Sequence, residues 1–198
     1  MSPTFGVKTQ EPLSHWEKIL DKWCKIIERL SPIMMPNDRP WWESEKANAG
    51  LIASAAIEST IPCFVETTVN IGDQRKICDL WLKFRSEPND GYGSEQEFVE
   101  LKLDEARDGH IRSERFEAAM RQAEAINIVE IKGRARIGAC LYRISGQSLA
   151  LDISALIRRF WEILRPDAIA WSFPECAGCI HTDNIYHLGA VLVLKKCV

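Results

Sequence analysis

Apolar residues recur along the chain with two periods, and each period predicts a different kind of element. Steps of three and four residues predict helices, because they place side chains on one helical face. Alternation of apolar and polar residues predicts strands, because successive side chains point to opposite faces. The expected helices span residues 14–30, 41–59, 113–127 and 153–164, and the expected strands span residues 62–72, 75–84, 96–104, 135–144, 168–173 and 185–195.

The order of these elements predicts a mixed α/β (α+β) fold, in which helices flank a central mixed β-sheet. The first three expected strands follow one another directly, so we expect them to form an antiparallel meander. An alanine-rich helix precedes the meander, and a helix and a further strand follow it. This order indicates one compact sheet domain and no repeat architecture.

The N-terminal region differs from the rest in pattern. Residues 1–12 are polar and include two prolines, which predicts a loose segment, and an amphipathic helix follows. Residues 31–40 contain three prolines and predict a connector. We therefore expect an N-terminal extension over residues 1–40, which carries one extra helix, and a single domain over residues 41–198.

Composition restricts the classes of function. The 198 residues are 46% apolar, which suits a globular core, and the net charge of -3 argues against a strongly basic nucleic-acid platform. A local patch or bound cation can still create an anion-binding site. No stretch approaches the ~20 apolar residues of a membrane span, so we expect no membrane partner. Seven cysteines, an odd number mostly within apolar runs, favour buried free thiols in a cytoplasmic protein.

Charged residues interrupt two neighbouring expected strands. Glu100 and Lys102 share one face of the strand 96–104, and Asp79 lies in the preceding strand. If these strands pair, Asp79 lies beside Glu100, and two close carboxylates raise each other's pKa. A divalent cation removes this repulsion, and Mg²⁺ often takes one or two carboxylates with waters and a phosphate. The alternative is a solvent-exposed sheet face with a local ion pair.

The arrangement resembles the PD-(D/E)XK, or restriction-endonuclease-like, nuclease superfamily. Asp79 is followed by twenty residues and then by Glu100-Leu101-Lys102, and residues 41–144 follow the family core of helix, three-stranded meander, helix and strand. The resemblance implies that Asp79 and Glu100 are metal-binding catalytic acids and that Lys102 is the catalytic lysine. It also implies Mg²⁺ or Mn²⁺ as the cofactor and the backbone carbonyl of Leu101 as a further ligand.

Two more site residues follow from the resemblance. Many family members have a glutamate on the helix before the meander, and Glu45 fits this position better by helical phase than Glu43 or Glu58. Some members have a glutamine on the helix after the lysine strand, and Gln122 matches it. The chain departs from the family pattern at Cys78, which stands where proline often precedes the aspartate. Helix-end charge and ordinary surface polarity are the alternative explanations for Glu45 and Gln122.

A second E-x-K motif tests the assignment. Glu130 and Lys132 also have this spacing, but the nearest upstream acid in a strand is Asp104. An expected helix of about four turns separates Asp104 from Glu130, so the two would not lie on a simple hairpin. We therefore favour Glu100 and Lys102 as the site.

A cysteine and histidine cluster near the C-terminus is a separate candidate. Cys176 and Cys179 have the C-x2-C spacing of zinc sites, and His181 and His187 could complete four ligands. The second pair is irregular in spacing, and His187 falls in an expected strand. Free thiols are the alternative that we favour over a Zn²⁺ clip.

These observations favour a Mg²⁺-dependent deoxyribonuclease that hydrolyses phosphodiester bonds. Basic residues along or near the helix 113–127, among them Arg112, Arg115 and Arg121, could hold phosphates, or they could form a solvated face. The small acidic chain would act as a homo-oligomer or as the nuclease subunit of a larger assembly, by analogy a prokaryotic antiviral defence or mobile-element system. The competing hypothesis is a non-catalytic binding or scaffold module of the same fold that acts through protein partners.

Overall fold

A computed structural model describes residues 4–34, 39–71, 74–84, 95–126, 134–148, 150–174, 179–180 and 185–197. Its elements follow the order β1 (Phe5–Thr9), a 3₁₀ turn (Ser14–Trp16), α1 (Glu17–Leu30), α2 (Pro40–Glu43), α3 (Glu45–Glu58), β2 (Cys63–Ile71), β3 (Gln74–Phe84), β4 (Glu95–Arg107), α4 (Glu114–Glu124), β5 (Arg134–Gly146), α5 (Ile153–Leu164), β6 (Ala168–Ser172), β7 (Cys179–Ile180) and β8 (Tyr186–Lys196).

The strands form one mixed eight-stranded sheet in the order β1-β6-β8-β5-β4-β3-β2, with β7 paired to β8. Strands β2, β3 and β4 form the expected antiparallel meander, whereas β5 pairs in parallel with β4. A parallel neighbour requires a crossover, and α4 provides it. The prediction of a mixed α/β fold with a central mixed sheet is confirmed at this level.

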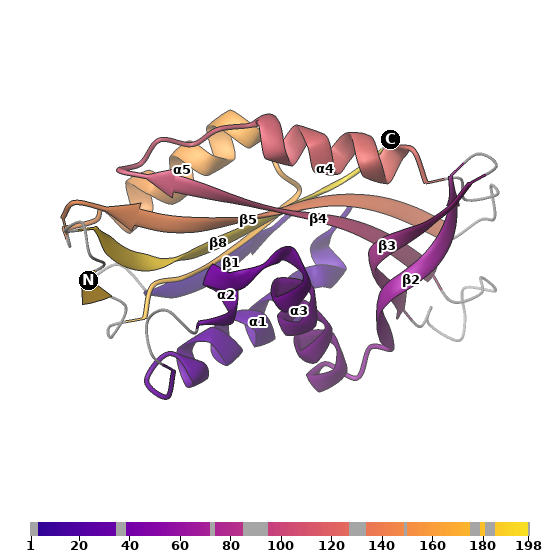
Figure 1. Cartoon of the computed structure of the whole chain (residues 1–198), viewed down its shortest axis with the longest axis horizontal. Coiled ribbons are helices and arrows are strands. Elements are labelled where there is room, and N and C mark those ends of the chain that lie inside the picture. Colours follow the sequence, from indigo (N-terminus) through magenta and orange to yellow (C-terminus); the bar gives the residue numbers. More distant parts are fainter. Residues whose placement is uncertain are drawn as a thin grey trace.

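Helices cover both faces of the sheet (Figure 1). Helices α1 and α3 pack on one face, where they bury leucines and alanines of the central strands in the larger core cluster. Helices α4 and α5 pack on the other face, around Phe116, Tyr142 and Phe160. Trp16 and Trp23 lie in the first core at 0% exposure, so the amphipathic N-terminal helix serves the sheet core. Within the described chain, no helix is long and apolar enough to cross a membrane.

Three expectations about the elements are wrong. Residues 5–9 are not loose, because they pair antiparallel with β6 as an edge strand. The expected helix 41–59 is two helices, α2 and α3, since Ser44 adopts an extended conformation and its side chain caps the N–H of Ala47. The two-residue strand β7 lies between the expected strands 168–173 and 185–195, where the sequence predicts a loop. The other expected elements are confirmed within a few residues.

The expectation of free thiols is confirmed for five of the cysteines. Cys24, Cys78, Cys140 and Cys197 are buried and Cys63 is partly buried, and none of these five forms a disulfide. Burial raises the pKa of the Cys24 thiol to about 12, so this group stays protonated at neutral pH. These cysteines behave as small apolar side chains in the core.

Glu97 is a buried structural acid that the strand pattern does not reveal. It looks like surface charge at a strand end, yet its side chain is 3% exposed. Its carboxylate accepts a hydrogen bond from Trp16 Nε1 at 2.6 Å and contacts His15 Nε2 at 2.8 Å. These contacts join the start of α1 to β4, on the face opposite Glu100.

Replacing Glu97 by alanine should lower the free energy of unfolding by about 2 kcal/mol, because the buried Trp16 N–H loses its charged acceptor. Urea unfolding followed by circular dichroism measures this change. Glu17, an exposed acid at the start of α1, provides the matched alanine control and should change stability by less than about 0.5 kcal/mol. Equal effects of the two substitutions would contradict the buried role of Glu97.

Candidate functional site

The candidate site lies where strand β3 separates from strand β4. Their paired residues run from Phe84 and Glu95 to Leu80 and Val99, and the pairing stops there. The next positions are Asp79 and Glu100. The backbone N–H of Leu101 donates to the side-chain carboxylate of Asp79 at 2.7 Å, beyond the end of the strand pairing. The meander thus brings Asp79 next to Glu100, as the sequence predicts.

Glu45 reaches the same edge of β4 from the start of helix α3. Its Oε1 accepts the N–H of Leu103 at 3.3 Å, and its Oε2 lies 3.3 Å from Lys102 Nζ. The helix break at Ser44 makes this contact available, because it turns Glu45 into the first residue of α3. Two carboxylates, from Asp79 and Glu45, therefore cover the edge of β4 that β3 leaves unpaired.

Glu100 is the most buried acid of the group, with 7% exposure. It pairs with Gly138 of β5, and a side chain at Gly138 would meet the Met120 backbone nitrogen of α4 at 2.8 Å. The glycine therefore lets α4 approach the sheet closely beside Glu100. Such close packing removes water from around the carboxyl group.

Burial and neighbouring charge both shift the ionisation of these acids. Desolvation, and after it the charge of Asp79, raise the pKa of Glu100 to about 7, although the charge of Lys102 opposes the shift. Desolvation also raises the pKa of Asp79, against the hydrogen bond from Leu101 and the charge of Lys102. A pair of close, desolvated carboxyl groups favours either a proton or a cation between them.

Lys102 is the cation of this cluster. Its side chain is 14% exposed and forms an ion pair with Glu45, whose side chain is 38% exposed. Its charge lowers the pKa of both Asp79 and Glu100. Lys76 also lowers the pKa of Glu100, so two lysines face three carboxylates, and the cluster is acidic when all three acids are ionised.

The carboxylates of Asp79, Glu100 and Glu45 are the groups here that could hold a divalent cation. Two carboxylates with waters and phosphate oxygens suit Mg²⁺. Leu101 directs its carbonyl to the same strand edge as its N–H, toward Asp79, since a strand residue presents both groups on one side. Among the described residues, no three His, Cys, Asp or Glu side chains already form a group with metal-holding geometry.

The other site residues expected from the sequence lie away from this cluster or fall outside the described residues. Gln122 is exposed on α4. Glu130 and Lys132 of the second E-x-K motif, and Cys176 and His181 of the proposed zinc cluster, fall outside the described residues. Cys179 pairs with His187 across β7 and β8, and His187 stacks on Trp42 with ring centroids 3.7 Å apart.

A polar cleft of about 440 Å³ continues from the candidate site along the free edge of β4. Leu103, whose N–H bonds to Glu45, lines it together with three arginines and three acids: Arg112, Arg115, Arg143, Asp104, Glu105 and Glu114. Asp104, buried to 6% exposure, holds Arg112 at 2.6 Å. Arg143 Nη1 donates to the Trp42 carbonyl at 3.2 Å, while its buried Nε has no hydrogen-bond partner.

The cleft contains two features that sequence reasoning missed. The Asp104–Arg112 pair joins the end of β4 to the segment before α4, so spacing along the chain gave no sign of it. Arg143 did leave a signal, because it is a charged residue within the apolar run of the expected strand 135–144. Arg112 and Arg115 were candidates for phosphate contacts, and both line the cleft.

Comparisons with known proteins identify no relative. Neither protein-family models, nor curated proteins, nor solved structures gave a match to this chain.

Proposed function

We propose that this protein is a metal-dependent nuclease that hydrolyses phosphodiester bonds of DNA at the site of Asp79, Glu100, Lys102 and Glu45. The observation that carries the proposal is the buried Glu100 carboxyl, whose pKa is about 7 beside Asp79, with Lys102 on the same strand. A divalent cation relieves the repulsion between these acids. Perturbed carboxyl groups in such a cluster are more typical of functional sites than of solvated sheet faces.

Each residue has a role in this proposal. Asp79 and Glu100 bind Mg²⁺ or Mn²⁺, with the Leu101 carbonyl as a further ligand, and the bound cation supplies Lewis-acid activation of water and phosphate. Lys102 orients the attacking water and stabilises the negative charge that develops on the phosphate. Glu45 holds Lys102 in place and is available to bind water or a second cation.

The test is cleavage of labelled DNA, single-stranded and double-stranded, by the purified full chain with Mg²⁺ or Mn²⁺. We expect product with either cation, none with EDTA, and none for Asp79→Asn or Glu100→Gln. RNA of the same sequence is tested as a second substrate, to compare cleavage of RNA with cleavage of DNA. Cation-independent cleavage, or cleavage that survives both substitutions, would contradict the proposal.

The three arginines of the polar cleft support a role in holding the DNA backbone. Replacing Arg115 or Arg143 by methionine should weaken DNA binding equally for all sequences and reduce the slope of log K against log salt by about 0.9 for each lost phosphate contact. Arg29 of α1, which is 62% exposed and pairs with Glu58, is the matched methionine control. Fluorescence anisotropy at several salt concentrations, with Ca²⁺ in place of Mg²⁺, measures the slopes.

A specific observation supports the competing hypothesis of a non-catalytic scaffold module. Two of the acids already have protein partners, Asp79 with the Leu101 N–H and Glu45 with Lys102. These contacts also stabilise the β4 edge without any cation. The scaffold hypothesis predicts that Asp79→Asn lowers stability but leaves cation binding and DNA cleavage unchanged from those of the unmodified chain.

We also propose that the chain works as a homo-oligomer or as a subunit of a larger assembly, such as a prokaryotic defence system. The small size and the net charge of -3 support this, because a small acidic chain holds long DNA poorly by itself. Light scattering of the purified chain distinguishes an oligomer from a monomer that needs other partners.

A further inference from the structure

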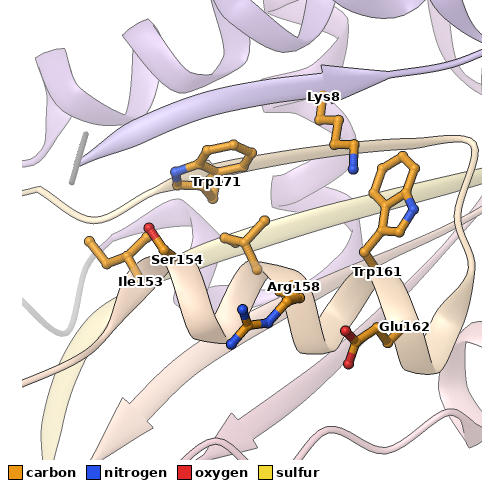
Figure 2. A pocket seen from close by; sticks show the side chains of 8 residues that line it. Lys8, Ile153, Ser154, Arg158, Trp161, Glu162 and Trp171 are labelled. Atoms are coloured by element: carbon orange, nitrogen blue, oxygen red, sulfur yellow. The ribbon is translucent and has the colours of Figure 1, made fainter.

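A second pocket lies at the opposite end of the sheet from the β3–β4 site. Its volume is about 350 Å³, which is in the range of small-molecule sites. Edge strand β1, strand β6 and helix α5 contribute its walls, and Figure 2 shows their side chains around the hollow. Ile153 and Ile157 of α5 form an apolar base.

Two tryptophans flank this pocket. Trp171 of β6 pairs with Gly6 of β1, and a Cβ atom at Gly6 would lie 2.4 Å from the indole ring. Only glycine therefore leaves room for the ring at this place. Trp161 stands on the other side, and Figure 2 shows the Lys8 amine between the two indoles.

The charged side chains that line the pocket indicate that a ligand would carry a negative charge. Lys8 Nζ lies 3.9 Å from the centre of the Trp161 ring, a cation–π contact. Lys8 and Arg158 supply two positive charges to the lining, whereas Glu162 supplies one negative charge.

We propose that this pocket binds a planar aromatic molecule that carries an anionic group. Its flat ring lies against the indoles and the isoleucines, because aromatic rings stack favourably on tryptophan. Its carboxylate or phosphate pairs with Lys8 or Arg158. Quaternary ammonium ligands also favour tryptophan faces, but Lys8 would repel them. A nucleotide and an aromatic acid both have the required chemistry, and this site is independent of the proposed nuclease activity.

The test follows the indole N–H signals of the ¹⁵N-labelled full chain by NMR, with the Trp171 signal assigned by Trp171→Phe. The probes are 5′-AMP and 2-naphthoate, each compared with its uncharged counterpart, adenosine and 2-naphthalenemethanol. We expect at least one anionic probe to shift the Trp171 signal in a saturable way and to bind more tightly than its uncharged counterpart. The probe that binds more tightly identifies a nucleotide or an aromatic acid as the ligand class.

Substitution of Lys8 by methionine should weaken binding of that probe about tenfold, through loss of the charge contact. Lys25 of α1, which is 55% exposed and pairs with Asp21, is the matched methionine control and should bind like the unmodified chain. Lys8 is exposed on an edge strand, so both variants should retain the unmodified melting temperature. Equal binding by both variants, or no preference for the anionic probes, would overturn the proposal.

Discussion

Replacing Lys102 by methionine should lower Mg²⁺-dependent DNA cleavage by about 1000-fold, the size of effect seen when a group that stabilises transition-state charge is removed. The ammonium group is the cation next to Asp79 and Glu100, and it lowers the pKa of both. Methionine retains the length of the side chain but cannot orient water or stabilise a developing negative charge. Single-turnover cleavage of end-labelled DNA measures the change.

A control variant and a stability measurement separate chemistry from folding in this experiment. Lys132→Met alters the second E-x-K motif of the chain and should leave cleavage unchanged. The Lys102–Glu45 ion pair is partly exposed, so its loss should change stability by no more than about 1 kcal/mol. If Lys132→Met rather than Lys102→Met abolishes cleavage, the active site has been placed on the wrong strand.

The cation-free protein should lose stability as the pH rises from about 5 to 8. The pKa of Glu100 is about 7 in the folded chain against an ordinary 4.5, so the folded state keeps a proton that the unfolded state has released. Between these values the unfolded state binds fewer protons, and the free energy of unfolding therefore falls with rising pH. The full difference corresponds to about 3 kcal/mol, since one pKa unit equals roughly 1.4 kcal/mol.

Urea unfolding in EDTA at several pH values measures this dependence. Glu100→Gln removes the ionisable group, so the variant should be more stable than the unmodified chain at pH 8 and should lack most of the pH slope. Glu58→Gln, at an exposed ion pair with Arg29, is the matched control and should retain the slope. The same slope in Glu100→Gln would show that another group is responsible.

Most of the sheet could be predicted because its strands show clear local patterns. Val99, Leu101 and Leu103 alternate with Phe98, Glu100 and Lys102, and they point to opposite faces as expected. The meander followed from the direct succession of three strands. The edge strand β1 could not be predicted, because its five residues are mostly polar or small and form a strand only by pairing with β6, more than 150 positions away.

The candidate site was predictable in part. Asp79 and Glu100 lie on consecutive strands, so pairing of the meander brings them together. Glu45 was predicted from the family resemblance, but its contact with the Leu103 N–H depends on the break between α2 and α3. That break rests on a single capping serine, Ser44, within a pattern that remains helical on both sides.

The electrostatic character of the site was outside the reach of sequence reasoning. Burial of Glu100 depends on the close approach of α4 at Gly138, and a glycine within an apolar strand does not reveal what packs on it. Glu97, three positions before Glu100, is also buried, but its carboxylate makes a structural contact with Trp16 and is not part of the candidate site. Alternation alone assigns a face to each acid but not its degree of burial.

The most direct measurement of the central claim is a Mn²⁺ titration of the full chain at pH 8, followed by isothermal calorimetry. We predict saturable binding at one site or two adjacent sites that is lost in Asp79→Asn and in Glu100→Gln and retained in Glu58→Gln, at an exposed ion pair with Arg29. Competition by Mg²⁺ should displace the Mn²⁺. Unchanged Mn²⁺ binding in Asp79→Asn and Glu100→Gln, or no binding by the unmodified chain, would contradict a metal-dependent nuclease site at these residues.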